Sequence, residues 1–150
     1  MRTEDLVQEK ELKLKTEIVP KNLWYLNLRK KLSKKEWDRI RKKSYLDAGY
    51  KCAICNIKGK INCHEIWEYN DNDHIQKLNG FTALCDNCHM IKHIGFANLQ
   101  ASRGLLDMNK LIEHFMKVNN VSKDIFEKHY DESFKIWGER NKHEWKQELK

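Results

Sequence analysis

Apolar residues recur at a helical interval between Ser33 and Gly49. They stand at Trp37, Ile40, Tyr45 and Ala48. This interval is typical of an α-helix with one buried side. Ser33 and Glu36 have the spacing of a capping box, in which a hydroxyl and a carboxylate each accept a hydrogen bond from a backbone N–H group. Because Gly49 can end a helix in a left-handed turn, we expect one helix between Ser33 and Gly49.

A different pattern begins after Gly59, which we place in a turn. Residues 61–67 alternate and are rich in β-branched and aromatic side chains, so they predict a strand. Residues 69–80 are rich in turn formers and predict a loop, which leads to a second strand near 81–84. A helix follows, because residues 89–94 contain no helix breaker before Gly95.

Beyond Gly104 the apolar pattern predicts two amphipathic helices, at about 107–118 and about 122–138. The only proline, Pro20, marks a boundary after a highly charged start. The chain then divides into a charged N-terminal arm or helix (1–20), a basic helical segment (21–50), a core (51–97) and C-terminal helices that pack on it (98–150). The predicted fold class is α+β and mostly helical.

The composition favours a protein that folds around its own core. The chain has 150 residues, of which 40% are hydrophobic, and this length suffices to bury a core. No apolar stretch approaches the roughly 20 residues of a membrane span, and residues 1–15 are charged throughout. We therefore expect a cytoplasmic protein with no membrane partner; its oligomeric state is left open.

Four of the five cysteines form two closely spaced pairs, Cys52-x-x-Cys55 and Cys85-x-x-Cys88. In a reducing compartment such clusters more often bind metal than form disulfides. Each pair can supply two adjacent corners of a Zn²⁺ tetrahedron, so we predict a structural zinc site. Cys63 lies outside the pairs and, as a small apolar residue on the predicted strand, needs no role.

Positive charge is concentrated in one part of the chain. Residues 21–60 contain 13 Lys and Arg against three acidic residues, a balance of +10, whereas residues 61–150 have a balance of −2. A local excess of this kind favours a polyanionic partner. The candidate DNA-binding residues on the predicted helix are Lys34, Lys35, Arg39, Arg41, Lys42 and Lys43.

Three histidines accompany the cysteine pairs. His89 and His93 are four residues apart, so on a helix they project from the same side and can bind one ion. His64 lies on the first predicted strand. A complete four-cysteine site has no need of these imidazoles, and they indicate a second metal-binding or catalytic site.

Three segments together resemble the zinc-framed HNH endonucleases, in particular the small stand-alone proteins of bacteria and phages. They are GYKCAIC at residues 49–55, the pair His64-Glu65, and LCDNCHMIKH at residues 84–93. The resemblance implies a ββα-metal core framed by a four-cysteine zinc site, with helices flanking it on both sides. It also implies an enzyme that hydrolyses DNA phosphodiester bonds with a general base and a divalent cation such as Mg²⁺ or Mn²⁺.

The resemblance implies roles for individual residues. His89 matches the final histidine of the motif and would be a catalytic metal ligand, and His93 would be a further ligand. At the strand motif two alternatives stay open. Either His64 is the base, and the neighbouring ligand is Cys63 or missing, or His64 binds metal and Glu65 is the base. Glu65 is also a candidate metal ligand.

Asn79 would brace the loop between the strands, one position from the usual asparagine. A non-catalytic zinc module that binds DNA or RNA is the alternative function.

Overall fold

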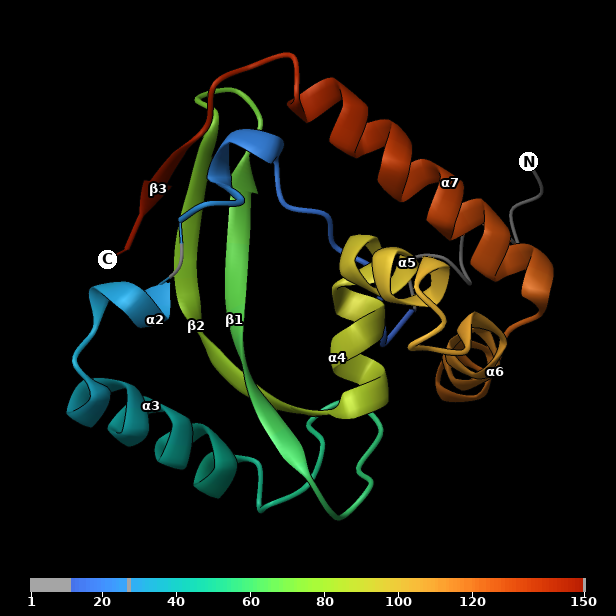
Figure 1. Ribbon diagram of the computed structural model, residues 1–150, viewed down its shortest axis with the longest axis horizontal. Coiled ribbons are helices and arrows are strands. Elements are labelled where there is room, and N and C mark those ends of the chain that lie inside the picture. The colour runs from blue at the N-terminus through green and yellow to red at the C-terminus, as the bar shows by residue number, and fades with distance from the viewer. Residues whose placement is uncertain (1–11, 27, 150) are drawn as a thin grey trace. The chain divides into compact units, whose positions relative to one another are not determined.

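The computed structural model describes residues 12–26 and 28–149, and their fold is α+β with about half of the chain in helices (Figure 1). This part of the chain forms two compact units. The sheet unit consists of residues 19–85 and 137–149, and the helical unit of residues 12–18 and 86–136. The predicted fold class is thus confirmed at this level, with a small sheet of three strands.

A long β-hairpin is the centre of the sheet unit. Strands β1 (Ile61–Asn70) and β2 (Ile75–Cys85) are antiparallel, and β3 (Lys146–Glu148) runs parallel to β2 on the side away from β1 (Figure 1). The predicted loop over 69–80 is therefore wrong, because only residues 71–74 separate the strands. Pairing along both sides of β2 stabilises an extended backbone in a segment whose composition suggests turns.

The turn formers Asn79 and Gly80 lie within β2 and produce a β-bulge there. Ile66 is opposite Gly80 but Trp67 is opposite Leu78, so Asn79 has no partner across the hairpin. Gly80 has φ +145°, a conformation that residues with a Cβ rarely adopt. The chain thus uses these residues to bend a strand.

The predicted helix between Ser33 and Gly49 is present as α3 (Lys34–Asp47), after the short helices η1 (Lys21–Leu23) and α2 (Leu28–Lys31). Its capping box is formed: the Glu36 N–H donates to Ser33 Oγ at 3.1 Å, and the Ser33 N–H donates to the Glu36 carboxylate at 3.2 Å. The helix packs on β1 and β2 through buried Trp37, whose ring meets Phe81 edge-on at 6.3 Å. Its cationic side remains exposed.

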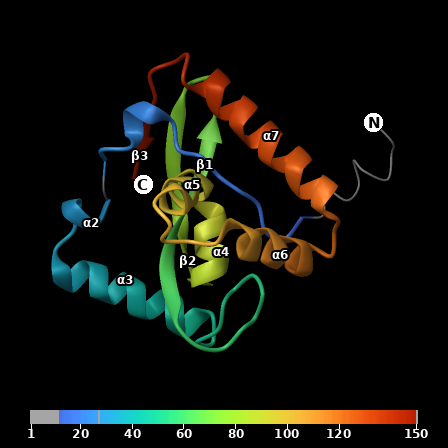
Figure 2. The same cartoon turned by 45° about the vertical axis from the view of Figure 1, so that its right-hand side comes forward.

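The helical unit contains α4 (Asp86–Lys92), α5 (Ile94–Ser102), α6 (Met108–Asn119) and most of α7 (Lys123–Arg140), whose last turn belongs to the sheet unit. Figure 2 shows α4 with α5 and α6, which it contacts. The predicted helices at 107–118 and 122–138 are confirmed to within about two residues. The helix predicted before Gly95 is α4, which ends at Lys92. The sequence did not predict α5, which begins at Ile94 and accepts Gly95 in its first turn, where a glycine costs a helix at most about 1 kcal/mol.

Residues 12–18 form a segment without helix or strand, and its alternate side chains are buried in the helical unit. Leu14 is fully buried, as is Phe115 of α6. The backbone N–H of Thr16 donates to Nε2 of His129 at 3.0 Å, and the Thr16 hydroxyl lies 2.6 Å from that of Ser133. Of the predicted N-terminal arm or helix, the part over residues 12–18 is thus an arm, and residues 1–11 lie outside the described residues.

No helix within residues 12–26 and 28–149 combines the length and apolar character that crossing a bilayer requires.

His129 makes the stability of the helical unit sensitive to acid. Burial first, and Lys15 second, lower its pKa to about 4, whereas an unfolded histidine has a pKa near 6.5. Between these pH values the unfolded state binds more protons, so the contribution is complete above about pH 6.5 and is lost as the pH falls toward 4.

We therefore expect His129→Gln, which can still accept from Thr16 but does not titrate, to weaken the pH dependence of unfolding by up to about one proton. Urea unfolding at a series of pH values between 4 and 7 measures this. An undiminished dependence in the variant would contradict the role of His129.

Candidate metal centres

The first cysteine pair lies in a tight turn, residues 51–58, which we call the first knuckle. A bridge between Lys51 and Lys58 closes it, and the Cys52 N–H donates to the Ile57 carbonyl at 3.0 Å. The Ala53 N–H donates to the Ala83 carbonyl of β2 at 2.8 Å. This bond fixes the knuckle beside the end of β2, where the second pair begins.

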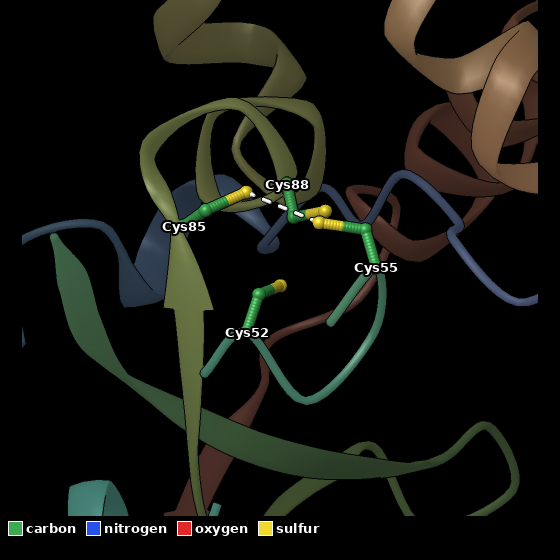
Figure 3. Close-up of side chains that lie close together, drawn as sticks. All are labelled: Cys52, Cys55, Cys85 and Cys88. Atoms are coloured by element: carbon green, nitrogen blue, oxygen red, sulfur yellow. Dashed lines mark hydrogen bonds between the residues drawn. The ribbon is translucent and has the colours of Figure 1, made fainter. Parts of the chain in front are cut away.

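The second pair occupies the junction of β2 and α4. Cys85 is the last residue of β2, and α4 begins directly after it at Asp86. Cys88 therefore lies in the first turn of α4. Together with Cys52 and Cys55 they form one group, in which the four sulfur atoms all lie within 4.8 Å of one another (Figure 3). The group is half-buried at Cys55 and buried at the other three. The four cysteines that the sequence selected are thus brought together and could hold a metal ion such as zinc.

The donor set fits zinc in both chemistry and size. Cys55 Sγ and Cys85 Sγ are 3.7 Å apart, too far for a disulfide at about 2.05 Å. Zn–S bonds of about 2.3 Å in a tetrahedron would separate the sulfurs by about 3.8 Å. Burial raises the pKa of the Cys52 thiol, but N–H donors of Cys55, Cys85 and Ile54 outweigh it and lower that pKa to about 7. The knuckle therefore favours the thiolate that a metal requires.

Cys63 does not belong to this group. It lies on β1, where the hydroxyl of Ser44 on α3 is its hydrogen-bond partner, and burial raises the pKa of its thiol. Cys63 therefore lies on the predicted strand, where the sequence required no metal role of it.

The second group of possible metal ligands consists of His64, His89 and His93. One ring nitrogen from each lies within 4.8 Å of the others, and His64 is buried whereas the other two are half-buried. Among the described residues, no further group of three or more such ligands occurs besides these two. Three of the four residues predicted to bind the catalytic cation are therefore brought together.

The local backbone holds His89 and His93 side by side. His89 is in α4, and although α4 ends at Lys92, the His93 N–H still donates to the His89 carbonyl at 3.0 Å. The two rings are 4.7 Å apart and nearly perpendicular. Burial lowers the pKa of His89, and burial together with His89 and Lys92 lowers that of His93 to about 4. Both imidazoles are therefore neutral at pH 7, the form that binds metal.

Glu65 is not part of the histidine group. Neighbouring strand residues point to opposite sides of a sheet, so Glu65 lies away from His64. Burial raises the pKa of its carboxyl, while Trp67, which hydrogen-bonds it, and the charge of Arg29 lower it. The structure thus separates two residues that the sequence treated as alternatives.

The exposed side of α3 carries a stripe of cations. Lys35, Arg39 and Lys42 stand at i, i+4 and i+7 and are all exposed, and Lys34 is exposed at the start of the helix. Trp37 and Ser44 occupy the opposite, buried side. We call Lys35, Arg39 and Lys42 the basic stripe.

Two of the six predicted DNA-binding residues have acidic partners within α3. Arg41 is half-buried, donates to Asp38 at 3.2 Å and lies over the Tyr45 ring. Lys43 pairs with Asp47 at 2.6 Å, although both side chains are largely exposed. Arg41 is the less available of the two, because burial and two partners hold it in place.

The prediction that Asn79 braces the loop is wrong, because Asn79 lies in β2 and donates to Glu68 of β1 at 2.8 Å. Asn70 performs that task instead. Its side-chain oxygen accepts from the N–H groups of Asn72 and Asp73, at 3.0 and 2.9 Å. Asn70 is the first residue of the polar run 70–74 and the last residue of β1. Its role in the turn could be recognised only once the end of the strand was known.

A histidine that sequence reasoning missed lies beside the cysteine group. Nε2 of His114, on α6, is 3.1 Å from Sγ of Cys88. The two residues are 26 positions apart, and no local spacing connects them.

No protein-family model matches this sequence, and neither a curated protein nor a solved structure is significantly similar to it.

The cysteine group predicts one tightly bound zinc per chain. We expect Cys85→Ser to lose the metal and to lower the midpoint of thermal unfolding, because a missing thiolate leaves the site incomplete. Cys63→Ser is the matched control and should retain one zinc. Elemental analysis of the purified proteins with differential scanning calorimetry measures both effects, and equal zinc loss in the two variants would contradict the assignment.

Proposed function

We propose that this chain is a metal-dependent endonuclease that hydrolyses phosphodiester bonds of DNA, of the zinc-framed HNH type. The observation that carries the proposal is the histidine group, His64, His89 and His93, found in addition to a complete set of four cysteines. A structural zinc needs only the cysteines. The three imidazoles therefore form a second group, separate from the cysteine ligands.

In this proposal His89 and His93 hold a divalent cation such as Mg²⁺ or Mn²⁺. When bound, such a cation supplies positive charge that stabilises the phosphate and the leaving oxygen. Both imidazoles come from one short segment, whose backbone bond between residues 93 and 89 keeps their rings together. The chain thereby offers two ligands with little loss of side-chain freedom.

His64 is the general base in this proposal. A neutral imidazole accepts a proton from water near neutral pH, and positioning it on a paired strand holds it close to the reacting phosphate. His64 is buried and lies opposite Thr82 in the hairpin. We prefer it to Glu65, because only His64 belongs to the histidine group.

The basic stripe of α3 serves as the surface that binds the DNA backbone. Three exposed cations on one side of a helix can each neutralise a phosphate, which favours binding without reading the sequence. The helix is anchored by Trp37 and its capping box, so these charges stay in a fixed row.

A zinc module that binds DNA without cutting it is the competing proposal. It accounts for the cysteines and the basic stripe, but it gives no purpose to the histidine group. Cleavage assays on single-residue variants separate the two proposals.

We expect nicking of supercoiled plasmid DNA with Mg²⁺ or Mn²⁺, and its loss in EDTA. His64→Ala and His89→Ala should each lower the rate by at least about 100-fold, the usual contribution of a general base or a metal ligand. Glu65→Gln should retain most of the activity. Agarose gels of the plasmid forms over time give the rates.

His143→Ala is the control for removing an imidazole, since His143 is exposed and outside the histidine group. Zinc content and thermal unfolding of every variant verify that the fold is retained. A wild-type rate in His89→Ala contradicts the nuclease proposal. DNA binding without cleavage by any metal-loaded preparation supports the competing one.

The basic stripe gives a separate expectation for binding. Changing Lys35, Arg39 and Lys42 to Gln should weaken DNA binding and reduce the slope of log affinity against log salt by roughly one unit per cation. A matched triple, Lys110, Lys123 and Lys135 to Gln, removes the same charge from exposed positions elsewhere. Fluorescence anisotropy at several salt concentrations measures the slope. Equal effects of the two triples would refute a specific surface on α3.

A further inference from the structure

The contact between α6 and the cysteine group has a chemical meaning beyond packing. Cys88 is fully buried, and His114 is half-buried. With Nε2 of His114 at 3.1 Å from Sγ of Cys88, the pair is within hydrogen-bonding distance. The helices that carry them, α4 and α6, are in direct contact.

Four thiolates around one Zn²⁺ carry a net charge of −2, which is costly in a buried site. N–H groups that donate to the sulfurs reduce this cost, and they act strongly where water is excluded. Cys52 receives such donors from the backbone of its own neighbourhood. For Cys88 a side-chain partner within hydrogen-bonding distance, His114, comes from another helix.

We propose that His114 is a positioning residue of the zinc centre, whose Nε2–H donates to the Cys88 thiolate and retains that thiolate as a ligand. The inference rests on the zinc centre of the proposed function. In this proposal α6 helps to retain the metal, and the packing of α6 against α4 depends in part on the bound ion. Removing a side chain that hydrogen-bonds a metal ligand commonly lowers metal affinity by about 10- to 100-fold.

His114 is not a ligand in this proposal. The cysteines already provide four donors, and His114 is not a member of their group. A nitrogen and a sulfur at adjacent corners of a zinc tetrahedron would be about 3.5 Å apart, farther than the observed 3.1 Å. The shorter distance is that of a hydrogen bond.

Two substitutions separate the donor from the bulk of the side chain. His114→Gln can present an amide N–H near the position of Nε2, whereas His114→Leu fills the space without a donor. Glu113→Gln, at the exposed neighbouring position of α6, is the control. These three variants, Cys88→Ser and the wild-type protein are purified as full chains, and their zinc content is determined before any kinetic measurement.

We expect transfer of zinc to an excess of a chromogenic chelator to be about 10-fold or more faster in His114→Leu, and near the wild-type rate in His114→Gln and Glu113→Gln. In Co²⁺-substituted protein, the sulfur-to-cobalt charge-transfer band should move to lower energy in His114→Leu only. This band reports on the thiolates, so a general loosening of the helices would not produce a selective shift.

Wild-type zinc retention and an unshifted band in His114→Leu overturn the role of His114. Equal losses in the Leu and Gln variants overturn it too, because they indicate packing and not a donor. A wild-type protein that binds no metal contradicts the zinc centre itself, which distinguishes that failure from a failure of His114. Reduced band intensity in His114→Gln, with full intensity in Cys88→Ser, would make His114 a ligand and also reject the proposal.

Discussion

Four sulfur atoms converge where the first knuckle meets the junction of β2 and α4, and both proposed centres are built around this point. Their mutual distances, all within 4.8 Å, suit thiolates around a cation and would be repulsive for thiolates alone. Two local features bring them together. A backbone bond from Ala53 to Ala83 fastens the first knuckle to β2, and α4 starts directly after Cys85, so that Cys88 turns back toward it.

The geometry of the histidine group also depends on the junction of β2 and α4. His89 follows Cys88 directly, so whatever fixes the first turn of α4 also fixes the first of the proposed ligands. The hairpin register places His64 of β1 opposite Thr82 of β2. Thr82 itself is only three residues before Cys85, so His64 lies near the cysteine group. A metal at the cysteines would thus stabilise the backbone that positions the proposed catalytic histidines, without itself taking part in the proposed reaction. The contact of His114 with Cys88 would connect α6 to the same site.

The side chains of residues 63–65 on β1 point alternately to the two sides of the hairpin. His64 lies on one side of β1, whereas Cys63 and Glu65 lie on the other, where Cys63 meets Ser44 of α3. That side of the hairpin holds the helix whose outer surface carries the basic stripe. In the proposed function, histidine chemistry and phosphate binding therefore belong to different elements.

Features that arise within one turn or one helix were predictable from the sequence: the capping box of α3, the cysteine pairs, the pairing of His89 with His93, and the cationic character of α3. These depend on spacing between near neighbours, which the backbone geometry converts directly into proximity. The packing of distant segments, in contrast, placed His64 and not Glu65 in the histidine group, extended β2 through Asn79, and brought His114 to Cys88. Each of these depends on what a strand or helix packs against, and such partners lie far away along the chain.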